Sequence, residues 1–211
     1  MDNFFRRHPM ATWPAPQRLH IYATPVDQRL RATVERYQDA LRPLAAEHGL
    51  GLLPPEWQHL TVQSLGLTRS EVSASEHAEL AEKLSKAVSQ VDPISLVIGP
   101  PQVSRHAIEL WVHPAADEPW SALVGAVRRE AADVLGADTL PPLGANGRPH
   151  TAIAYGIGRG DSGVLTSALQ QVRTEPVAIE VRQVRLVAVT QHPSKGWFTW
   201  DSIADLPLAA G

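Results

Sequence analysis

The chain has 211 residues, 44% of them hydrophobic and 19% charged, and a formal net charge of −3. This apolar content is enough for one large globular domain or two small lobes. The sequence contains no cysteine, which excludes disulfides, thiolate nucleophiles and cysteine-bound metal centres. Its lysines and arginines are scattered, unlike those of proteins that bind long nucleic acids. No apolar run approaches the roughly 20 residues of a membrane span, so we expect no membrane contact and a cytoplasmic location. We also expect a monomer.

Residues 1–16 show no sustained periodicity and contain Trp13-Pro14-Ala15-Pro16, which predicts an irregular N-terminal arm. From Leu30 to Leu44, apolar residues recur every three or four positions, the pattern of an amphipathic helix, and Gly49 suits its C-terminal cap. The elements predicted in this half are a strand at 17–23, a helix from 27 to about 48 that bends at Pro43, a strand at 59–65, a helix at about 75–90 and a strand at 94–98.

The second half repeats this order of elements. It predicts a strand at 107–112, a helix at about 119–135, a strand at 149–155, a helix at 164–172, a strand at 177–189 and a closing strand at 197–206. The interval from Pro25 to His59 is close to that from Pro114 to His150. We therefore expect a single bilobal domain at 17–211 with half-repeats of roughly 17–104 and 105–208. The expected fold class is α+β, with two antiparallel or mixed sheets flanked by helices around a central cleft of pseudo-two-fold symmetry.

His59 and Thr61 form the pattern of a histidine followed two positions later by a hydroxyl residue within a strand. Side chains two apart in a strand share a face. The Thr61 hydroxyl could then donate to a phosphate oxygen while the imidazole moves a proton, which a group of unperturbed pKa near 6.5 can do at neutral pH. A second strand that begins with a histidine, His150, would supply the opposite role.

Other motifs in the sequence carry less information. His192 also precedes a serine by two positions, but Pro193 and the residues that follow describe a turn. Residues 158–163 match G-x-G-x-x-G, yet the acidic residue of a dinucleotide site is not at a strand end about 20 positions on, so a connecting loop is expected. The sequence has no nucleophile elbow, P-loop or H-E-x-x-H motif.

Two segments, residues 56–63 with Gly66 and residues 148–155, resemble the two signature strands of actinobacterial proteins of the 2′-5′ RNA ligase family, within the 2H phosphoesterase superfamily. The resemblance extends from about Trp13 to Leu206, although only these two segments are specific. It implies a bilobal α+β fold with a pseudo-two-fold axis, no metal and no cofactor. It also implies hydrolysis of, or ring closure to, cyclic phosphates, with 2′-5′ ligation in some members.

By this resemblance His59 and His150 are the catalytic pair and Thr61 binds phosphate. The second strand departs from the family pattern, because Ala152 stands where a Ser or Thr is expected. Thr151 is a neighbour that would need a bulge to reach the His150 face. Without it, one phosphate-binding hydroxyl is missing, and a lost charge-assisted hydrogen bond typically costs about 1.5–3 kcal/mol.

Three further residues are candidates for substrate binding. Trp57, two before His59, could stack on a base, and Arg148, two before His150, could hold a phosphate. The alternatives are a core-capping indole and a solvated loop arginine. Tyr155 is five positions after His150 and in a regular strand would lie on the opposite face, which predicts a packing or rim residue. For His20, on the first strand, we favour a structural role.

The leading hypothesis is a cyclic phosphodiesterase acting on a small, nucleotide-like 2′,3′-cyclic phosphate or related phosphodiester. One histidine would be the general base for water and the other the general acid for the leaving oxygen. A second hypothesis is a non-catalytic module that binds a nucleotide or RNA end. A third is an enzyme of specialised metabolism on the same fold. The sequence does not assign the base and the acid between the two histidines.

Overall fold

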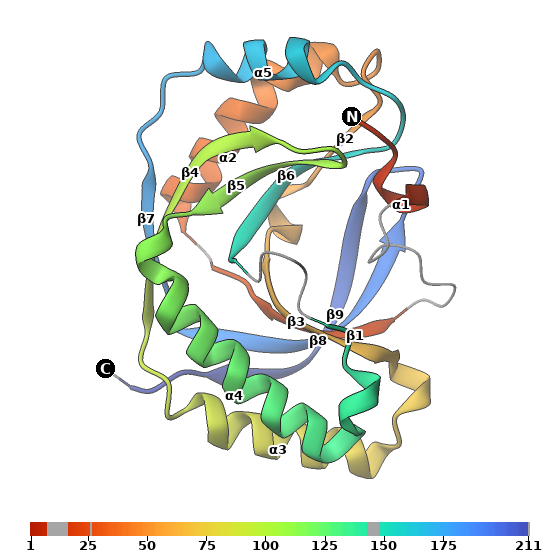
Figure 1. Cartoon of the computed structure of the whole chain (residues 1–211), viewed down its shortest axis with the longest axis vertical. Helices are drawn as coiled ribbons and strands as arrows, with labels where there is room; N and C mark the ends of the chain where they lie inside the picture. The colour runs from red at the N-terminus through yellow and green to blue at the C-terminus, as the bar shows by residue number, and fades with distance from the viewer. Residues whose placement is uncertain (8–16, 26, 143–147, 211) are drawn as a thin grey trace.

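The computed structural model describes residues 1–7, 17–25, 27–142 and 148–210, and consists of two sheets with helices on their outer faces (Figure 1). Sheet A has the order β3-β1-β8-β9 and sheet B the order β2-β6-β5-β4-β7. Every strand pair in the described residues is antiparallel. The predicted α+β class with two sheets is therefore confirmed. The strands are β1 (Arg18–Ala23), β2 (Leu50–Leu52), β3 (Leu60–Thr68), β4 (Ile94–Val103), β5 (Ala107–Val112), β6 (His150–Gly156), β7 (Val177–Val181), β8 (Gln183–His192) and β9 (Trp197–Pro207).

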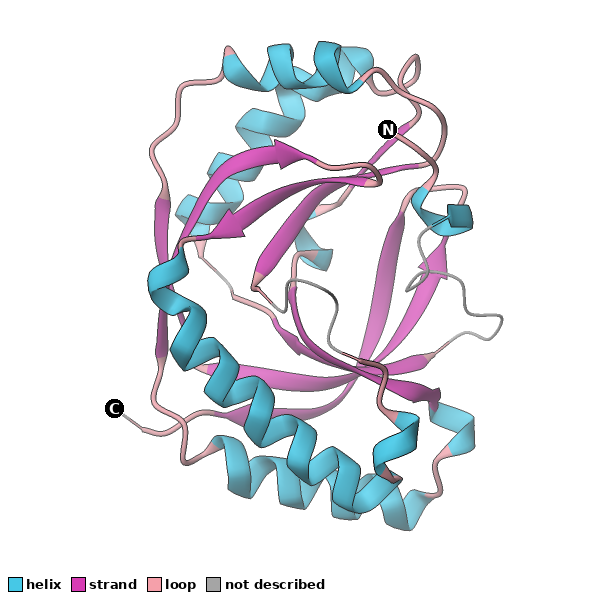
Figure 2. Cartoon of the chain, in the orientation of Figure 1, coloured by secondary structure: helices cyan, strands magenta, loops and turns pink. Residues whose placement is uncertain are grey.

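The long helices form the outer layers of the molecule (Figure 2). Helices α3 and α4 pack together, and against strands of sheet A, while α2 and α5 pack against strands of sheet B. Each presents an apolar stripe to its sheet, for example Leu80, Leu84 and Val88 on α3. The helices are α1 (Phe4–Arg7), α2 (Gln28–Leu41), α3 (Ala74–Val88), α4 (Asp117–Leu135) and α5 (Ser162–Gln170), with short 3₁₀ turns η2 (Arg42–Leu44), η3 (Pro55–Trp57), η4 (Arg69–Glu71), η5 (Pro114–Ala116) and η6 (Ala137–Thr139).

Each sheet contains strands from both halves of the chain. In sheet A, β1 and β3 of the first half are joined to β8 and β9 of the second half through the β1–β8 pair; in sheet B, β5, β6 and β7 of the second half pair with β4 and β2 of the first half. The order strand, helix, strand, helix, strand does recur along the chain. The half-repeat boundaries near residues 104 and 105 stay a prediction, and they do not coincide with the two sheets.

Three sequence expectations differ from the structure. The single strand predicted at 177–189 is wrong, because the chain passes at Arg182 from β7 in sheet B to β8 in sheet A. The helix predicted to reach His48 ends at Leu41, and Pro43 lies in the 3₁₀ turn that follows, since proline cannot supply the helical N–H. Strand β2 was not predicted, because its three residues are too few to show a period.

The N-terminal segment contains more structure than the predicted irregular arm. Residues Phe4–Arg7 form one helical turn, and the Phe5 ring is buried against Tyr155 and Phe198. The prolines that motivated the prediction lie outside the described residues.

A β-bulge interrupts the alternation of side chains in both β3 and β6. On β3, Tyr22 pairs with Thr61 and Ile21 with Gln63, so Val62 is the extra residue. On β6, Glu109 pairs with Ala152 and Ile108 with Ala154, so the extra residue is Ile153. A bulge changes which residues share a face beyond it. The two bulges occupy the same position, three residues after His59 and His150 respectively.

The facing surfaces of the two sheets meet in an inter-sheet cluster, which is largely aromatic and aliphatic. Sheet A contributes Tyr22, Val187, Val189 and Phe198; sheet B contributes Ala107, Ala152 and Tyr155; Phe5 and Leu53 complete its buried part. His59, which precedes β3, stacks on Tyr22 of this cluster, whereas Leu60, the first residue of β3, is buried in the larger core that includes Leu80 and Leu84 of α3.

Candidate active site

The two predicted catalytic histidines occupy matching places in the fold. His59 immediately precedes β3 and His150 is the first residue of β6. Each ring is held by its own chain, with His59 Nδ1 2.9 Å from the Trp57 carbonyl oxygen and His150 Nδ1 3.0 Å from that of Arg148. Because a carbonyl oxygen can only accept, Nδ1 carries the proton in both rings. The Nε2 atom of each neutral ring is then free of its proton and can act as a base.

The surroundings of His59 favour its neutral form. Its ring stacks on Tyr22, with centroids 4.0 Å apart and planes inclined by 15°, and meets Trp200 edge-on at 5.2 Å. Burial between these rings and, to a smaller extent, the charge of His150 lower the pKa of His59 to about 4, against the opposing effect of the hydrogen bond to Trp57. The interaction between the two imidazoles places them in one electrostatic site.

The surroundings of His150 are more polar. Its side chain is 39% exposed, and its Nε2 lies 3.8 Å from Glu109 Oε1 on the neighbouring strand β5. Its ring also packs at a tilt on Trp111, with centroids 4.9 Å apart. Burial raises the pKa of Glu109, whereas the charge of His150 lowers it. The two histidines thus share a backbone setting but differ in the side chains that contact their rings.

Thr61 pairs with Tyr22 of β1, and the two side chains lie on the same face of sheet A. Thr61 is exposed. A hydrogen bond between the Thr61 and Tyr22 side chains opposes the effect of burial, which raises the pKa of Tyr22. The corresponding residue on β6, Ala152, pairs with Glu109 in the way that Thr61 pairs with Tyr22. Where sheet A has a hydroxyl group paired with a phenol, sheet B has a methyl group paired with a carboxyl group.

The bulge in β6 changes the face on which Tyr155 lies, whereas Thr151 faces away from His150, as expected for its neighbour in a regular strand. Thr151 precedes the bulge, pairs with Leu110 and is 1% exposed, so it stays on the helix-covered face and does not reach the His150 face. Tyr155 follows the bulge and pairs with Ala107, on the same face as Glu109 and Trp111. The face expected for Tyr155 was wrong because a regular strand was assumed.

Trp57 and Arg148, the residues whose carbonyls hold the histidines, have their own contacts. The Trp57 ring meets Trp200 at 4.9 Å beside His59, so it lies at the site. The Arg148 guanidinium donates to the Val112 carbonyl at 3.0 Å and to Asp117 at 3.3 Å. Arg148 is therefore engaged at the first turn of α4, with its guanidinium carbon 5.9 Å from the Trp111 ring centroid.

Four residues of the site were not found in the sequence: Tyr22, Glu109, Trp111 and Trp200. They lie on β1, β5 and β9, far along the chain from the histidine strands, and strand pairing alone brings them there. His20, for which a structural role was favoured, is buried two residues before Tyr22, and burial lowers its pKa to about 3.

Outside this site, the glycine-rich loop at 158–163 has a packing role. A Cβ on Gly160 would lie 2.5 Å from the His48 carbonyl oxygen, and one on Gly49 would lie 2.7 Å from Gly158. Asp161 caps α5. These close approaches explain the glycines without a dinucleotide. None of the helices in the described part of the chain has the length and apolar character needed to cross a bilayer.

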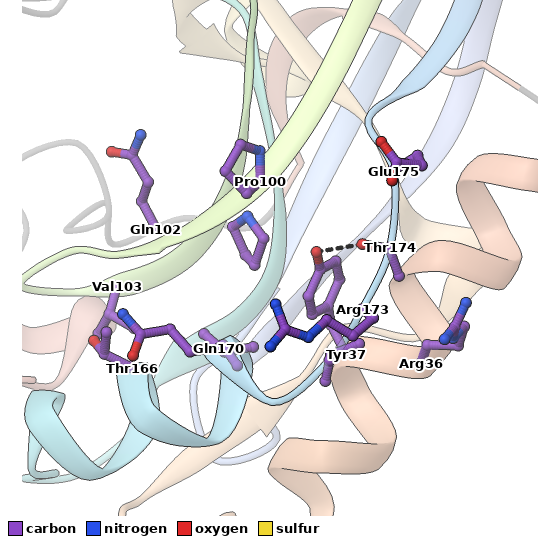
Figure 3. A pocket seen from close by; sticks show the side chains of 13 residues that line it. Arg36, Tyr37, Pro100, Gln102, Val103, Thr166, Gln170, Arg173, Thr174 and Glu175 are labelled. Atoms are coloured by element: carbon purple, nitrogen blue, oxygen red, sulfur yellow. Dashed lines mark hydrogen bonds between the residues drawn. The ribbon is translucent and has the colours of Figure 1, made fainter.

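A surface pocket of about 820 Å³ lies beyond the outer face of sheet B, between α2, α5 and β4 (Figure 3). Its lining includes Arg36, Arg173 and Glu175, and Tyr37 shares a 2.5 Å hydrogen bond with Thr174 at its base. Its lining residues include none of the predicted site residues.

The model of the 2′-5′ RNA ligase superfamily matches residues 26–193, which include both histidine segments. The chain belongs to this superfamily. A comparison with curated proteins gives no match. The superfamily match covers most of the sequence and supports an enzyme of the 2H type, in a superfamily of phosphoesterases and ligases.

Solved structures share the superfamily fold at low sequence identity. TT0787 of Thermus thermophilus is 19% identical, with a TM-score of 0.65, and the match covers 90% of this chain and 97% of that one. Escherichia coli LigT complexed with 3′-AMP is 15% identical, with a TM-score of 0.60 and 93% and 100% coverage. ATU0111 from Agrobacterium tumefaciens is 14% identical, with a TM-score of 0.57 and 89% and 86% coverage. These likenesses establish the two-sheet architecture.

Proposed function

We propose that the protein is a metal-independent cyclic phosphodiesterase that acts on a small, nucleotide-like 2′,3′-cyclic phosphate through His59 and His150. The observation that carries the proposal is the matched setting of the two rings, each with Nδ1 held by a carbonyl and Nε2 left for proton transfer. General acid and base groups must be held in place to act in both directions. Membership of a superfamily of phosphoesterases and ligases supports the reaction class.

Thr61 would bind a non-bridging phosphate oxygen, because its exposed hydroxyl lies two residues beyond His59 and next to Tyr22. Trp57 and Trp200, whose rings meet beside His59, would pack on the base or sugar of the substrate. The LigT structures complexed with 3′-AMP, ATP and phosphate support a nucleotide-like ligand for this chain. Tyr155, though on the right face, would act through packing, since its ring is buried against Phe4 and Phe198.

The proposal is tested by incubating the purified protein with the four nucleoside 2′,3′-cyclic phosphates, with and without EDTA. We expect turnover that survives EDTA and falls by at least about 100-fold in His59→Ala and in His150→Ala, the scale on which general acid or base groups contribute. His192→Ala is the matched control, because His192 also precedes a serine by two positions but bonds to Thr199 in the β8–β9 hairpin. Full activity in either His59→Ala or His150→Ala would show that the two histidines are not the catalytic pair.

Ala152 favours one alternative, a module that binds a nucleotide or RNA end without turnover. The inter-sheet face of β6 carries a methyl group where the first strand carries a hydroxyl. Binding of a nucleotide by calorimetry, combined with no hydrolysis and no 2′-5′ joining of RNA ends, would select this alternative. Loss of binding in Thr61→Val would place the ligand at the same site.

A further inference from the structure

Strands β1 and β5 contribute one residue each at equivalent positions beside the two histidines. Tyr22 pairs with Thr61, two residues after His59, and Glu109 pairs with Ala152, two residues after His150. Tyr22 and Glu109 are equivalent in strand register, because the residue that each pairs with comes directly before the extra residue of a bulge. Two otherwise matching strand pairs thus place an aromatic ring against one imidazole and a carboxyl group near the other.

The hydrogen bonds of His150 determine what this carboxyl group does. Its Nδ1–H already donates to the Arg148 carbonyl, so Nε2 is the atom that faces Glu109 Oε1, 3.8 Å away. A neutral ring would direct an unprotonated nitrogen at a carboxylate oxygen, which is repulsive. A proton on either Nε2 or the carboxyl group removes the repulsion, and an imidazolium between two oxygen acceptors is stabilised by both.

We infer that Glu109 decides which histidine is the general acid. By holding a proton at Nε2 of His150, it makes His150 the general acid and His59 the general base. Glu109 is a positioning residue that acts through His150. The inference rests on the proposed function and adds the roles of the two histidines to it.

In the hydrolytic step, Nε2 of His59 takes a proton from water as the water oxygen bonds to phosphorus. The bond from phosphorus to one ribose oxygen breaks, and that oxygen keeps the electron pair and receives the proton from Nε2 of His150. The resulting charged His59 and neutral His150 return to their starting forms by proton exchange with solvent. The low pKa of His59 agrees with the role of base.

Among the described residues, few titratable groups face the pair of Glu109 and His150. Tyr155 on β6 interacts with Glu109, which together with burial raises the pKa of the phenol. His59 faces His150 from the entry to β3, and Tyr22 on β1 interacts with Tyr155. Both phenols are neutral at the pH values of interest. Beside the Trp111 ring that packs on His150, Arg148 and Asp117 form an ion pair with each other.

The test compares the wild-type protein with Glu109→Gln, which keeps the shape of the side chain and removes its charge. Histidine titrations followed by NMR in the free protein should place the pKa of His150 above that of His59, and Glu109→Gln should lower the pKa of His150 by about one unit. The alkaline limb of the pH profile of kcat/KM should move down by the same amount, while the acid limb stays in place. Glu118→Gln, at an exposed position on α4, is the matched control for charge and should change neither.

An unchanged His150 titration in Glu109→Gln, or a wild-type His59 that titrates above His150, would overturn the inference. The wild-type ordering requires no variant, so a Glu109→Gln protein that failed to fold would still leave a decisive measurement. Absence of turnover on every phosphodiester would refute the proposed function instead, and the NMR titrations would still decide the position of the proton.

Discussion

Thr61 is the residue at which the two halves of the site differ most simply, since its counterpart Ala152 has no hydroxyl. Under the proposed function the site has one phosphate-binding hydroxyl instead of two, so Thr61 would carry a larger share of the binding. We expect Thr61→Val to lower kcat/KM by roughly ten- to a hundredfold, from the loss of a charge-assisted hydrogen bond of about 1.5–3 kcal/mol.

Thr61→Ser separates the hydroxyl from the shape of the side chain. It should retain most of the activity toward the cyclic phosphates, because the donor is kept. Equal losses in the serine and valine variants would mean that Thr61 acts by packing on Tyr22 rather than by donating to phosphate.

At the scale of single elements, Gln38 of α2 stabilises the bulge in β6. Its buried amide donates to the carbonyl of Ile153, the extra residue of the bulge, at 2.9 Å, and to the carbonyl of Leu53 at 2.7 Å. The Leu53 N–H also donates to Ile153, at 3.0 Å. One side chain thus connects the segment that leads to His59 with the strand that begins at His150.

Gln38→Leu should therefore weaken the fold. It removes this donor from the Leu53 carbonyl, while the Ile153 carbonyl keeps its bond from the Leu53 N–H. An unsatisfied buried group costs about 1–3 kcal/mol, and we expect a fall of that order in the free energy of unfolding by urea. Gln171→Leu, at an exposed position after α5, is the control and should change it little. A Gln38→Leu protein as stable as the wild type would show that the bulge does not depend on this amide.

The sequence predicted most of the elements, because periodicity and spacing are local properties, and the motif with the family resemblance marked both histidine strands. The helix of α4 and strand β5 were predicted nearly to the residue. Glu109 and Tyr22 were missed because strand pairing is not local. Tyr155 is a packing residue, as predicted, but it lies on the face of Glu109 and Trp111, because a bulge leaves no mark in the alternation of β6. The division at Arg182 was missed because both flanking segments continue as apolar strands, so only the pairing partners distinguish β7 from β8.

At the scale of the whole molecule, two buried histidines make stability depend on pH. The pKa of His59 is lowered to about 4 and that of His20 to about 3, from about 6.5 in the unfolded chain, both chiefly by burial. The unfolded state therefore binds more protons below pH 6.5. This contribution to stability is complete above about pH 6.5 and is lost as the pH falls toward the folded pKa values.

We expect the free energy of unfolding to decrease by on the order of 5 kcal/mol between pH 7 and pH 4, because each pKa unit corresponds to about 1.4 kcal/mol. Urea titrations across this range measure the decrease. His20→Asn, which keeps a side-chain N–H donor, should remove about half of this decrease. A wild-type stability independent of pH in this range would contradict the burial argument.

The exchange of strands between the two halves has a mechanical consequence. Strand β4 leaves the first half to pair in sheet B, strand β8 leaves the second half to pair in sheet A, and a single residue joins β7 to β8 across the two sheets. Within the described residues, the sheets therefore have no pair of flexible linkers about which they could swing open as rigid bodies. The distance between the imidazoles is set by the folded backbone, so we expect substrates to be selected by whether they fit a fixed gap rather than by closure around them.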